Sequence, residues 1–287
     1  RARVVAEAAA VVLVPGQAPF ANEYGLADDG GLGGRVGGQR QRLGQGKPAS
    51  GGQDVLVFSL EMARAELMAK SISRHTLTLA LARKWGTACA KTARGVTDGR
   101  RYAQYGERER EVIRDAVTRY GEYAGHLFIA EGVGDIGVTA IRERIARHID
   151  LTGKTPLVIV DYLQIIAPYN ERATDKQNMD KAVLELKRIS RDFKLPMIAV
   201  SSLNRMSYGQ RISMEAFKES GAIEYSSDVL IGLQLRGAGE AAFDPTEAKK
   251  KNPRQIEAVI LKNRNGRVGE KIEFEYYPMF NYFTEKG

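Results

Sequence analysis

The sequence predicts an α/β fold with a mainly parallel sheet, covered by helices on both faces and ending in an antiparallel hairpin. Short apolar runs alternate with stretches in which apolar residues recur at helical spacing, as in strands joined by crossover helices. Several of these runs are continuous rather than alternating, which is typical of parallel strands buried on both faces. The last two runs follow each other directly, which predicts a hairpin at one edge of the sheet.

The first predicted elements lie between residues 54 and 130. Residues 54–60 and 126–130 are short apolar runs, so we expect two strands. One helix is predicted over residues 62–75, with apolar positions at Leu67, Met68 and Ile72. A second is predicted over residues 107–120, with a face made of Val112, Ile113, Ala116, Val117 and Tyr120. The irregular basic stretch between them, with Arg83-Lys84-Trp85 and Lys91-Thr-Ala-Arg94, either contacts phosphates or forms a solvated loop.

The rest of the chain continues the alternation. A helix from residue 138 carries Ile141, Ile145 and Ile149 on one stripe, and a strand is predicted at residues 156–161. A helix over residues 179–193 leads to a strand at residues 196–201. Further strands are predicted at residues 228–235 and 257–262, and residues 271–277 and 280–283 form the terminal hairpin.

The N-terminal segment differs from this pattern. Residues 30–52 are dense in glycine, arginine and glutamine and cannot bury enough apolar surface to offset their ordering entropy. We therefore divide the chain into an atypical Gly/Ala/Arg-rich segment, residues 1–52, which we expect to be poorly ordered, and one α/β domain, residues 53–287.

The amino-acid composition indicates which class of partner and which cellular compartment to expect. A formal charge of +8 and a pI near 9.5 favour a polyanionic partner, nucleic acid before membrane. The single Cys89 excludes an intrachain disulfide and, with three histidines in all, argues against a zinc centre and for a reducing cytoplasm. Residues 4–14 are apolar but interrupted by Glu7 and shorter than the roughly 20 residues of a membrane span. We expect a cytoplasmic protein without a membrane partner.

Two predicted strands each deliver a carboxylate to the edge where ligands bind in open α/β sheets. Asp161 ends the strand Pro156-Leu-Val-Ile-Val-Asp161, and Glu61 follows the strand at residues 54–60. Asp161 could hold a magnesium ion, and Glu61 could deprotonate an attacking water. The alternatives are that Asp161 caps the next turn and that Glu61 sits in the first turn of the following helix, near its positive end.

Five segments in sequence carry a family resemblance. They are Phe58-Ser-Leu-Glu-Met62, Val158-Ile-Val-Asp-Tyr-Leu-Gln164, Ser201-Ser-Leu-Asn-Arg205, Phe217-Lys-Glu-Ser-Gly-Ala-Ile-Glu224 and Leu261-Lys-Asn-Arg-Asn-Gly266. In content, order and spacing they resemble the C-terminal motor domain of DnaB-type replicative DNA helicases, which has a RecA-like three-layer fold. The resemblance covers about Gly52 to Phe283 and is greatest to short relatives in mobile elements that lack an amino-terminal primase-binding domain.

The resemblance implies ATP and Mg²⁺ as cofactors and assigns residues to them. Glu61 would be the catalytic base and Asp161 the acid that holds the metal, while Gln164 and Ser202 would lie at the nucleotide. Lys262 and Arg264 match a cationic pair that reaches the nucleotide of the neighbouring subunit, where a guanidinium stabilises charge on the transferring phosphate. Their alternative role is a basic turn between strands.

The resemblance to DnaB-type helicases also implies macromolecular partners. Lys218, Glu219 and Gly221 match a loop that holds the backbone of single-stranded DNA, although by themselves they would be a plain surface turn. The resemblance further implies a homo-oligomer, a hexameric ring in this family.

Two departures from the family pattern stand out. Ser202 occupies the position of a glutamine that senses the γ-phosphate. The loop G-x-x-x-x-G-K-[ST] is absent, and the corresponding stretch, residues 44–50, contains Gly46-Lys47 followed by Pro48, which has no amide hydrogen to donate to a phosphate. No strand is predicted before it. One hypothesis is that residues 1–50, and a shorter segment at residues 84–90, are out-of-frame translations.

We therefore expect a DNA helicase motor that couples ATP hydrolysis to movement on single-stranded DNA in replication, with hydrolysis impaired by the missing loop. The alternatives are a RecA-related recombination ATPase, which the Lys-Asn-Arg motif disfavours, and a non-hydrolysing DNA-binding or assembly subunit.

Overall fold

The computed structural model describes residues 8–13, 52–132, 134–203, 209–217 and 221–286. These residues form a nine-stranded sheet in the order β3-β2-β4-β5-β1-β6-β7-β8-β9. The strands are β1 (Ala8–Leu13), β2 (Val55–Ser59), β3 (Leu127–Glu131), β4 (Leu157–Asp161), β5 (Met197–Ser202), β6 (Val229–Leu235), β7 (Arg254–Asn263), β8 (Lys271–Tyr277) and β9 (Tyr282–Glu285). The larger helices are α3 (Arg64–Ala82), α6 (Glu107–Ala124), α7 (Val138–Thr152) and α8 (Asp175–Phe193).

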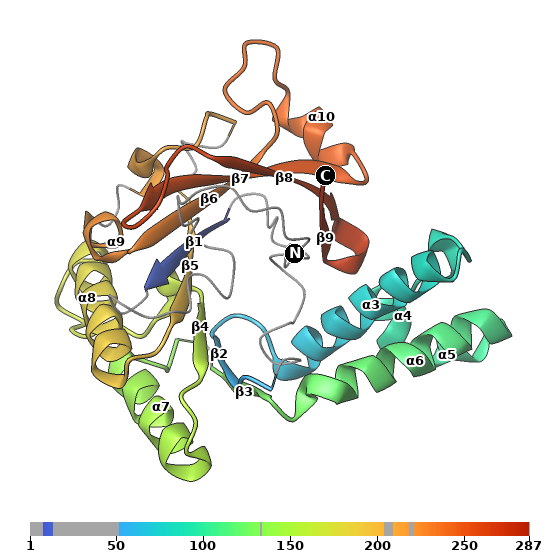
Figure 1. Cartoon of the computed structure of the whole chain (residues 1–287), viewed down its shortest axis with the longest axis horizontal. Coiled ribbons are helices and arrows are strands. Elements are labelled where there is room, and N and C mark those ends of the chain that lie inside the picture. The colour runs from blue at the N-terminus through green and yellow to red at the C-terminus, as the bar shows by residue number, and fades with distance from the viewer. Residues whose placement is uncertain (1–7, 14–51, 133, 204–208, 218–220, 287) are drawn as a thin grey trace, which may run out of the picture.

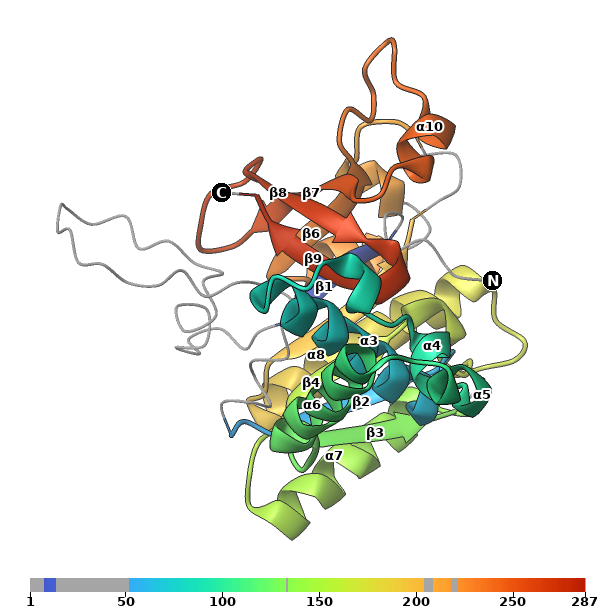
Figure 2. The ribbon, with the colours of Figure 1, turned by 90° about the vertical axis from the view of Figure 1, so that its right-hand side faces the viewer.

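The parallel part of the sheet is covered on both faces. Strands β3, β2, β4 and β5 are parallel, with α7 and α8 on one side and α3 and α6 on the other (Figure 1). In Figure 2, β3 lies between α7 and α6. Alternate residues explain the two layers: Leu56 and Val158 pack in the cluster with α7 and α8, whereas Val55 and Leu157 pack against Tyr123 of α6. The prediction of a parallel α/β core is confirmed.

The antiparallel part is larger than the predicted hairpin. Strands β6, β7, β8 and β9 are successive antiparallel neighbours, so the hairpin of β8 and β9 is the outer half of a four-stranded antiparallel unit. Phe280 was expected in the last strand, but it lies in a short 3-10 helix, Pro278–Phe280, that turns the chain between β8 and β9.

A strand precedes residue 44, contrary to expectation. β1 pairs antiparallel with both β5 and β6, so β5 and β6 run in the same direction on either side of it. The sequence analysis noted the apolar run at residues 4–14 that contains β1, Ala-Ala-Ala-Val-Val-Leu, but weighed it only as a membrane span and assigned it to the poorly ordered segment. Residues 14–51, including the stretch around Gly46, lie outside the described residues.

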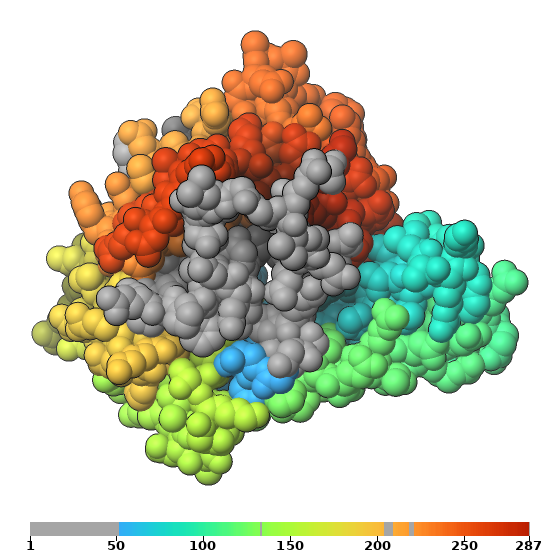
Figure 3. Space-filling view, viewed as in Figure 1, coloured from blue at the N-terminus to red at the C-terminus, as the bar shows by residue number. Residues whose placement is uncertain are grey.

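The predicted irregular basic stretch is instead a compact cap on the arm formed by α3 and α6, which projects from the body of the protein (Figure 3). It contains a 3-10 helix (Thr87–Cys89), α4 (Ala93–Thr97) and α5 (Gly99–Ala103). Lys91 is buried and pairs with Glu109, and Arg83 pairs with Glu111 at 3.3 Å and with Asp115. Neither cation therefore belongs to a solvated loop, and both already have carboxylate partners.

The helix predictions need two smaller corrections. α3 continues seven residues beyond the predicted end at His75, to Ala82. Met68 is 40% exposed and Val117 is 48% exposed, so neither lies on the buried face of its helix. In contrast, Val112, Ile113 and Ala116 are buried as expected.

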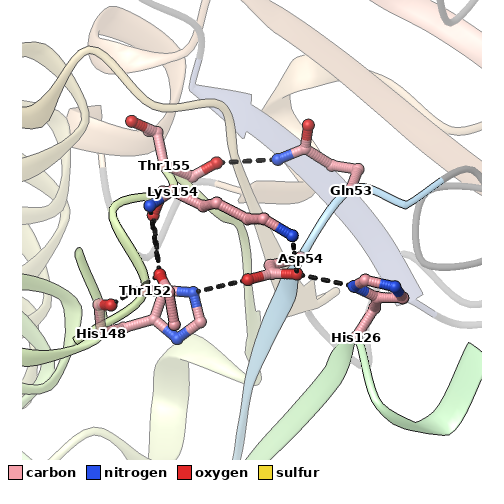
Figure 4. A network of polar contacts seen from close by, with 7 residues as sticks. All are labelled: Gln53, Asp54, His126, His148, Thr152, Lys154 and Thr155. Carbon is pink, nitrogen blue, oxygen red and sulfur yellow. Dashed lines mark hydrogen bonds and ion pairs between the residues drawn. The ribbon is translucent and has the colours of Figure 1, made fainter.

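One polar cluster joins the amino ends of the parallel strands (Figure 4). Asp54, which precedes β2, is 3% exposed. Its Oδ1 accepts a hydrogen bond from Nδ1 of His126 at 2.8 Å, and its Oδ2 lies 3.3 Å from Nε2 of His148, outside hydrogen-bond geometry. Nζ of Lys154 lies 3.7 Å from Oδ1. The cluster holds the starts of β2 and β3 against the end of α7, at the edge opposite Asp161.

Within the described part of the chain, no helix is long and apolar enough to cross a membrane.

Candidate nucleotide and subunit-interface site

The two predicted carboxylates lie at the same edge of the sheet. Ser59, the last residue of β2, is aligned with Asp161 on β4 and with Glu131 on β3. The amide of Leu60 donates to the carbonyl oxygen of Asp161 at 2.8 Å, which places Glu61 directly beside the end of β4. The parallel register therefore brings Glu61 and Asp161 together, as the sequence predicted.

Glu61 does not belong to the helix that follows it. α3 begins at Arg64, with Ala63 at its N-cap and Glu66 as the acidic residue of its first turn. Oγ of Ser59 donates to the carbonyl oxygen of Met62 at 2.6 Å and stabilises the turn that carries Glu61. Because Glu61 precedes the helix and is exposed, the alternative that it merely occupies the first helical turn is wrong.

Glu131 is a third carboxylate at this edge, and the sequence analysis missed it. Its Oε2 accepts from the backbone amide of Arg64 at 2.6 Å, so it holds the first residue of α3 against the end of β3. Nη2 of Arg64 donates to the carbonyl oxygen of Ile129 at 2.8 Å and strengthens the same contact. The available signal was that a third predicted strand is followed by an acid.

Gln164 and Ser202 are also brought together. Oε1 of Gln164 accepts from the amide of Ser202 at 3.2 Å, and its Nε2 donates to Oγ of Ser201 at 2.9 Å. The short 3-10 helix Leu163–Ile165 after β4 thus presents the Gln164 amide to the end of β5. A carboxamide consequently lies beside Ser202, where the family pattern has a glutamine.

The donor atoms at this edge fit a magnesium ion. Magnesium usually takes one or two carboxylates and keeps several waters or phosphate oxygens. Among the described residues, no group of three or more His, Cys, Asp or Glu side chains could hold a metal, so protein ligands alone would not complete a shell. Asp161, the predicted metal-holding acid, is within this number of carboxylates, and Glu61, the predicted base, lies beside the end of its strand. The stretch around Gly46 that would have to cradle the phosphates lies outside the described residues.

Lys262 and Arg264 lie elsewhere on the sheet. β5, β1 and β6 separate β7 from β4, which corresponds to roughly 19 Å at about 4.8 Å between neighbouring strands. Because β7 is antiparallel to β6, its carboxyl end is at the edge opposite Asp161. The structure therefore does not bring the cationic pair to Glu61 and Asp161 within one subunit.

Lys262 contacts α9 (Gly221–Ser226) itself, and Arg264 contacts the segment that connects α9 to β6. Nζ of Lys262 donates to the carbonyl oxygen of Glu224 at 2.5 Å, and Nη1 of Arg264 lies 2.9 Å from Oδ1 of Asp228. Burial, and next the charge of Arg264, lower the pKa of Lys262 below its usual value. The basic-turn alternative is too simple, because the two side chains have defined partners.

The predicted DNA-binding loop is only partly described. Lys218 and Glu219 lie outside the described residues. Gly221 is the first residue of α9, directly after them, so this prediction stays a prediction.

Comparison with known proteins identifies the family. Residues 45–285 match the model of the DnaB-like helicase C terminal domain. The replicative DNA helicase DnaB of Leifsonia xyli subsp. xyli is 27% identical over 236 residues, which cover 80% of this chain and 45% of the relative. That of Haemophilus influenzae is 28% identical over 235 residues, which cover 80% and 44%. The chain thus spans less than half the length of these relatives.

Solved structures show the same fold. One solved structure is that of a DnaB-like replicative helicase, described with its interactions with primase. It superposes on this chain with a TM-score of 0.66 at 21% sequence identity, covering 82% of this chain and 51% of that one. This similarity confirms the predicted RecA-like fold. With the family model matching most of the sequence, the chain belongs to the DnaB-like helicase C-terminal domain family.

Proposed function

We propose that this chain is the motor domain of a cytoplasmic DNA helicase that assembles into a homo-oligomeric ring, by family resemblance a hexamer, around single-stranded DNA. In this arrangement Asp161 holds magnesium, Glu61 activates water, and Gln164 and Ser202 contact the nucleotide. Lys218, Glu219 and Gly221 contact the DNA backbone.

The observation that carries the proposal is the separation of the two halves of the site. The carboxylates Glu61 and Asp161 lie at one edge of the sheet, and Lys262 and Arg264 lie at the opposite edge, several strands away. Phosphoryl transfer needs both a carboxylate-held metal and cations on the developing charge. One subunit would therefore supply the metal and base, and its neighbour the lysine and arginine.

We further propose that hydrolysis is impaired in this chain. Backbone amides and a lysine supply much of the affinity of a phosphate-binding loop, and Gly46-Lys47-Pro48 interrupts that row of donors. The same observation favours a second candidate function, a DNA-binding or assembly subunit that does not hydrolyse ATP. Nucleotide binding distinguishes the two.

The test is a calorimetric titration of the purified chain with ATP and Mg²⁺, with Asp161→Asn as the matched control. We expect binding weaker than micromolar, because Asp161 and Glu61 alone repel phosphates. Micromolar binding that requires Mg²⁺ and is lost in Asp161→Asn would show that another segment rebuilds the phosphate site, and would favour an active motor.

A further inference from the structure

Asp228 is a buried carboxylate that holds two cations from different parts of the fold. It is 6% exposed and immediately precedes β6. Lys187 of α8 and Arg264, just beyond β7, both form ion pairs with it. The backbone adds a second link, because the amide of Arg264 donates to the carbonyl oxygen of Asp228 at 2.9 Å. Arg264 thus contacts Asp228 twice, through a backbone hydrogen bond and through an ion pair that lies outside hydrogen-bond geometry.

The neighbouring contacts extend this link to α9. Lys262 donates to the carbonyl oxygen of Glu224, near the end of α9, at 2.5 Å. At the other end of the helix, the amide of Ala222 donates to Oδ1 of Asp180 at 3.4 Å. Ile223 is buried in the main core, so α9 is anchored rather than free to swing. The end of this short helix contacts Lys262, and Asp228, which pairs with Arg264, follows the helix by two residues.

Exposure and charge suit Asp228 to a positioning role. Its side chain is 9% exposed, whereas that of Arg264 is 56% exposed, so the anchor is buried while the guanidinium faces outward. A guanidinium has five N–H donors, and one ion pair leaves others available for phosphate oxygens. Lys187, Lys262 and Arg264 surround this one carboxylate, and without it their mutual repulsion would displace Arg264.

We propose that Asp228 is a positioning residue: it holds Arg264 in a defined outward-facing orientation. The use of that orientation at the neighbouring nucleotide rests on the proposed function, whereas the hold of Asp228 on Arg264 does not.

The experiment measures the reactivity of Arg264 in the full chain. Phenylglyoxal modifies accessible guanidinium groups, and peptide mass spectrometry gives the rate at each arginine. Arg254, the first residue of β7, serves as the internal reference. Asp228→Asn should speed modification of Arg264 about fivefold relative to Arg254, because the lost ion pair frees the side chain. Asp228→Glu, which keeps the charge, should restore most of the slow rate.

A matched control separates positioning from general loosening of the sheet. Glu257 is a similarly buried carboxylate on β7, bonded to Lys271 at 2.9 Å and to Gln234 at 2.8 Å. Glu257→Gln should leave the rate at Arg264 unchanged. Equal acceleration in Glu257→Gln, or no acceleration in Asp228→Asn, overturns the proposal.

Discussion

The Asp54 cluster allows a quantitative prediction about stability. Asp54→Ala removes a carboxylate that is 3% exposed and joins the starts of β2 and β3 to the end of α7 (Figure 4). The substitution leaves the apolar core clusters untouched, because none of them includes Asp54. The change in the free energy of unfolding therefore measures how much the polar cluster contributes to stability.

The magnitude follows from the contacts. The hydrogen bond from His126 at 2.8 Å goes to a charged acceptor, for which loss costs about 1.5–3 kcal/mol. The 3.3 Å approach of Nε2 of His148 adds nothing to this sum, because it lies outside hydrogen-bond geometry. Lys154 contributes little, because it lies 3.7 Å away and its side chain is 53% exposed. We expect a loss of about 2 kcal/mol, or roughly 4–8 °C in Tm for a domain of this size.

The assay is thermal unfolding followed by circular dichroism, with Lys154→Ala as the control. Lys154→Ala should lower Tm by no more than about 3 °C, because an exposed pair is worth less than about 1 kcal/mol. If Asp54→Ala stays within about 2 °C of the wild type, the cluster does not hold the strand ends together, and the reasoning is refuted.

Three further predictions concern pH, DNA and the subunit interface. Burial, and next the charge of Arg74, lowers the pKa of His75 from 6.5 to about 4. The unfolded chain therefore takes up a proton at this residue first as the pH falls, and the free energy of unfolding should drop by ~1–2 kcal/mol between about pH 6.5 and 4, discounted for partial exposure. Urea unfolding of the His75→Gln variant should not show this pH dependence. Lys218→Ala should weaken binding to all single-stranded sequences alike and reduce the salt slope by about 0.7, and unchanged affinity in an assembled oligomer would remove it from the site. In a chain given a working phosphate loop, Arg264→Ala and Glu61→Gln should each abolish ATP hydrolysis, and their mixture should regain part of it; mixed oligomers that never exceed the separate activities would place the arginine's action within its own subunit.

Sequence reasoning succeeded where local pattern and one topological rule suffice. The continuous apolar runs at residues 54–60 and 156–161 identify buried parallel strands, and parallel strands place their carboxyl ends at one edge. That rule alone brings Glu61 and Asp161 together. Sequence reasoning failed for the short helices between residues 87 and 103. Helices of three to five residues have no amphipathic period and depend on tertiary contacts, such as the hydrogen bond from the Tyr105 hydroxyl to the carbonyl oxygen of Gly95 at 3.0 Å.

The sequence by itself determined the α/β class, the parallel core and the family to which the chain belongs, because strand runs, helical periods and short motifs are local properties of the chain. Only the tertiary structure decided which charged groups meet. His126 contacts Asp54 across 72 positions, and Lys187 contacts Asp228 across 41. No local pattern encodes such contacts, since they arise when the sheet order places distant segments side by side. For the same reason, the separation of Arg264 from Asp161 followed from the order of the strands and not from the motifs.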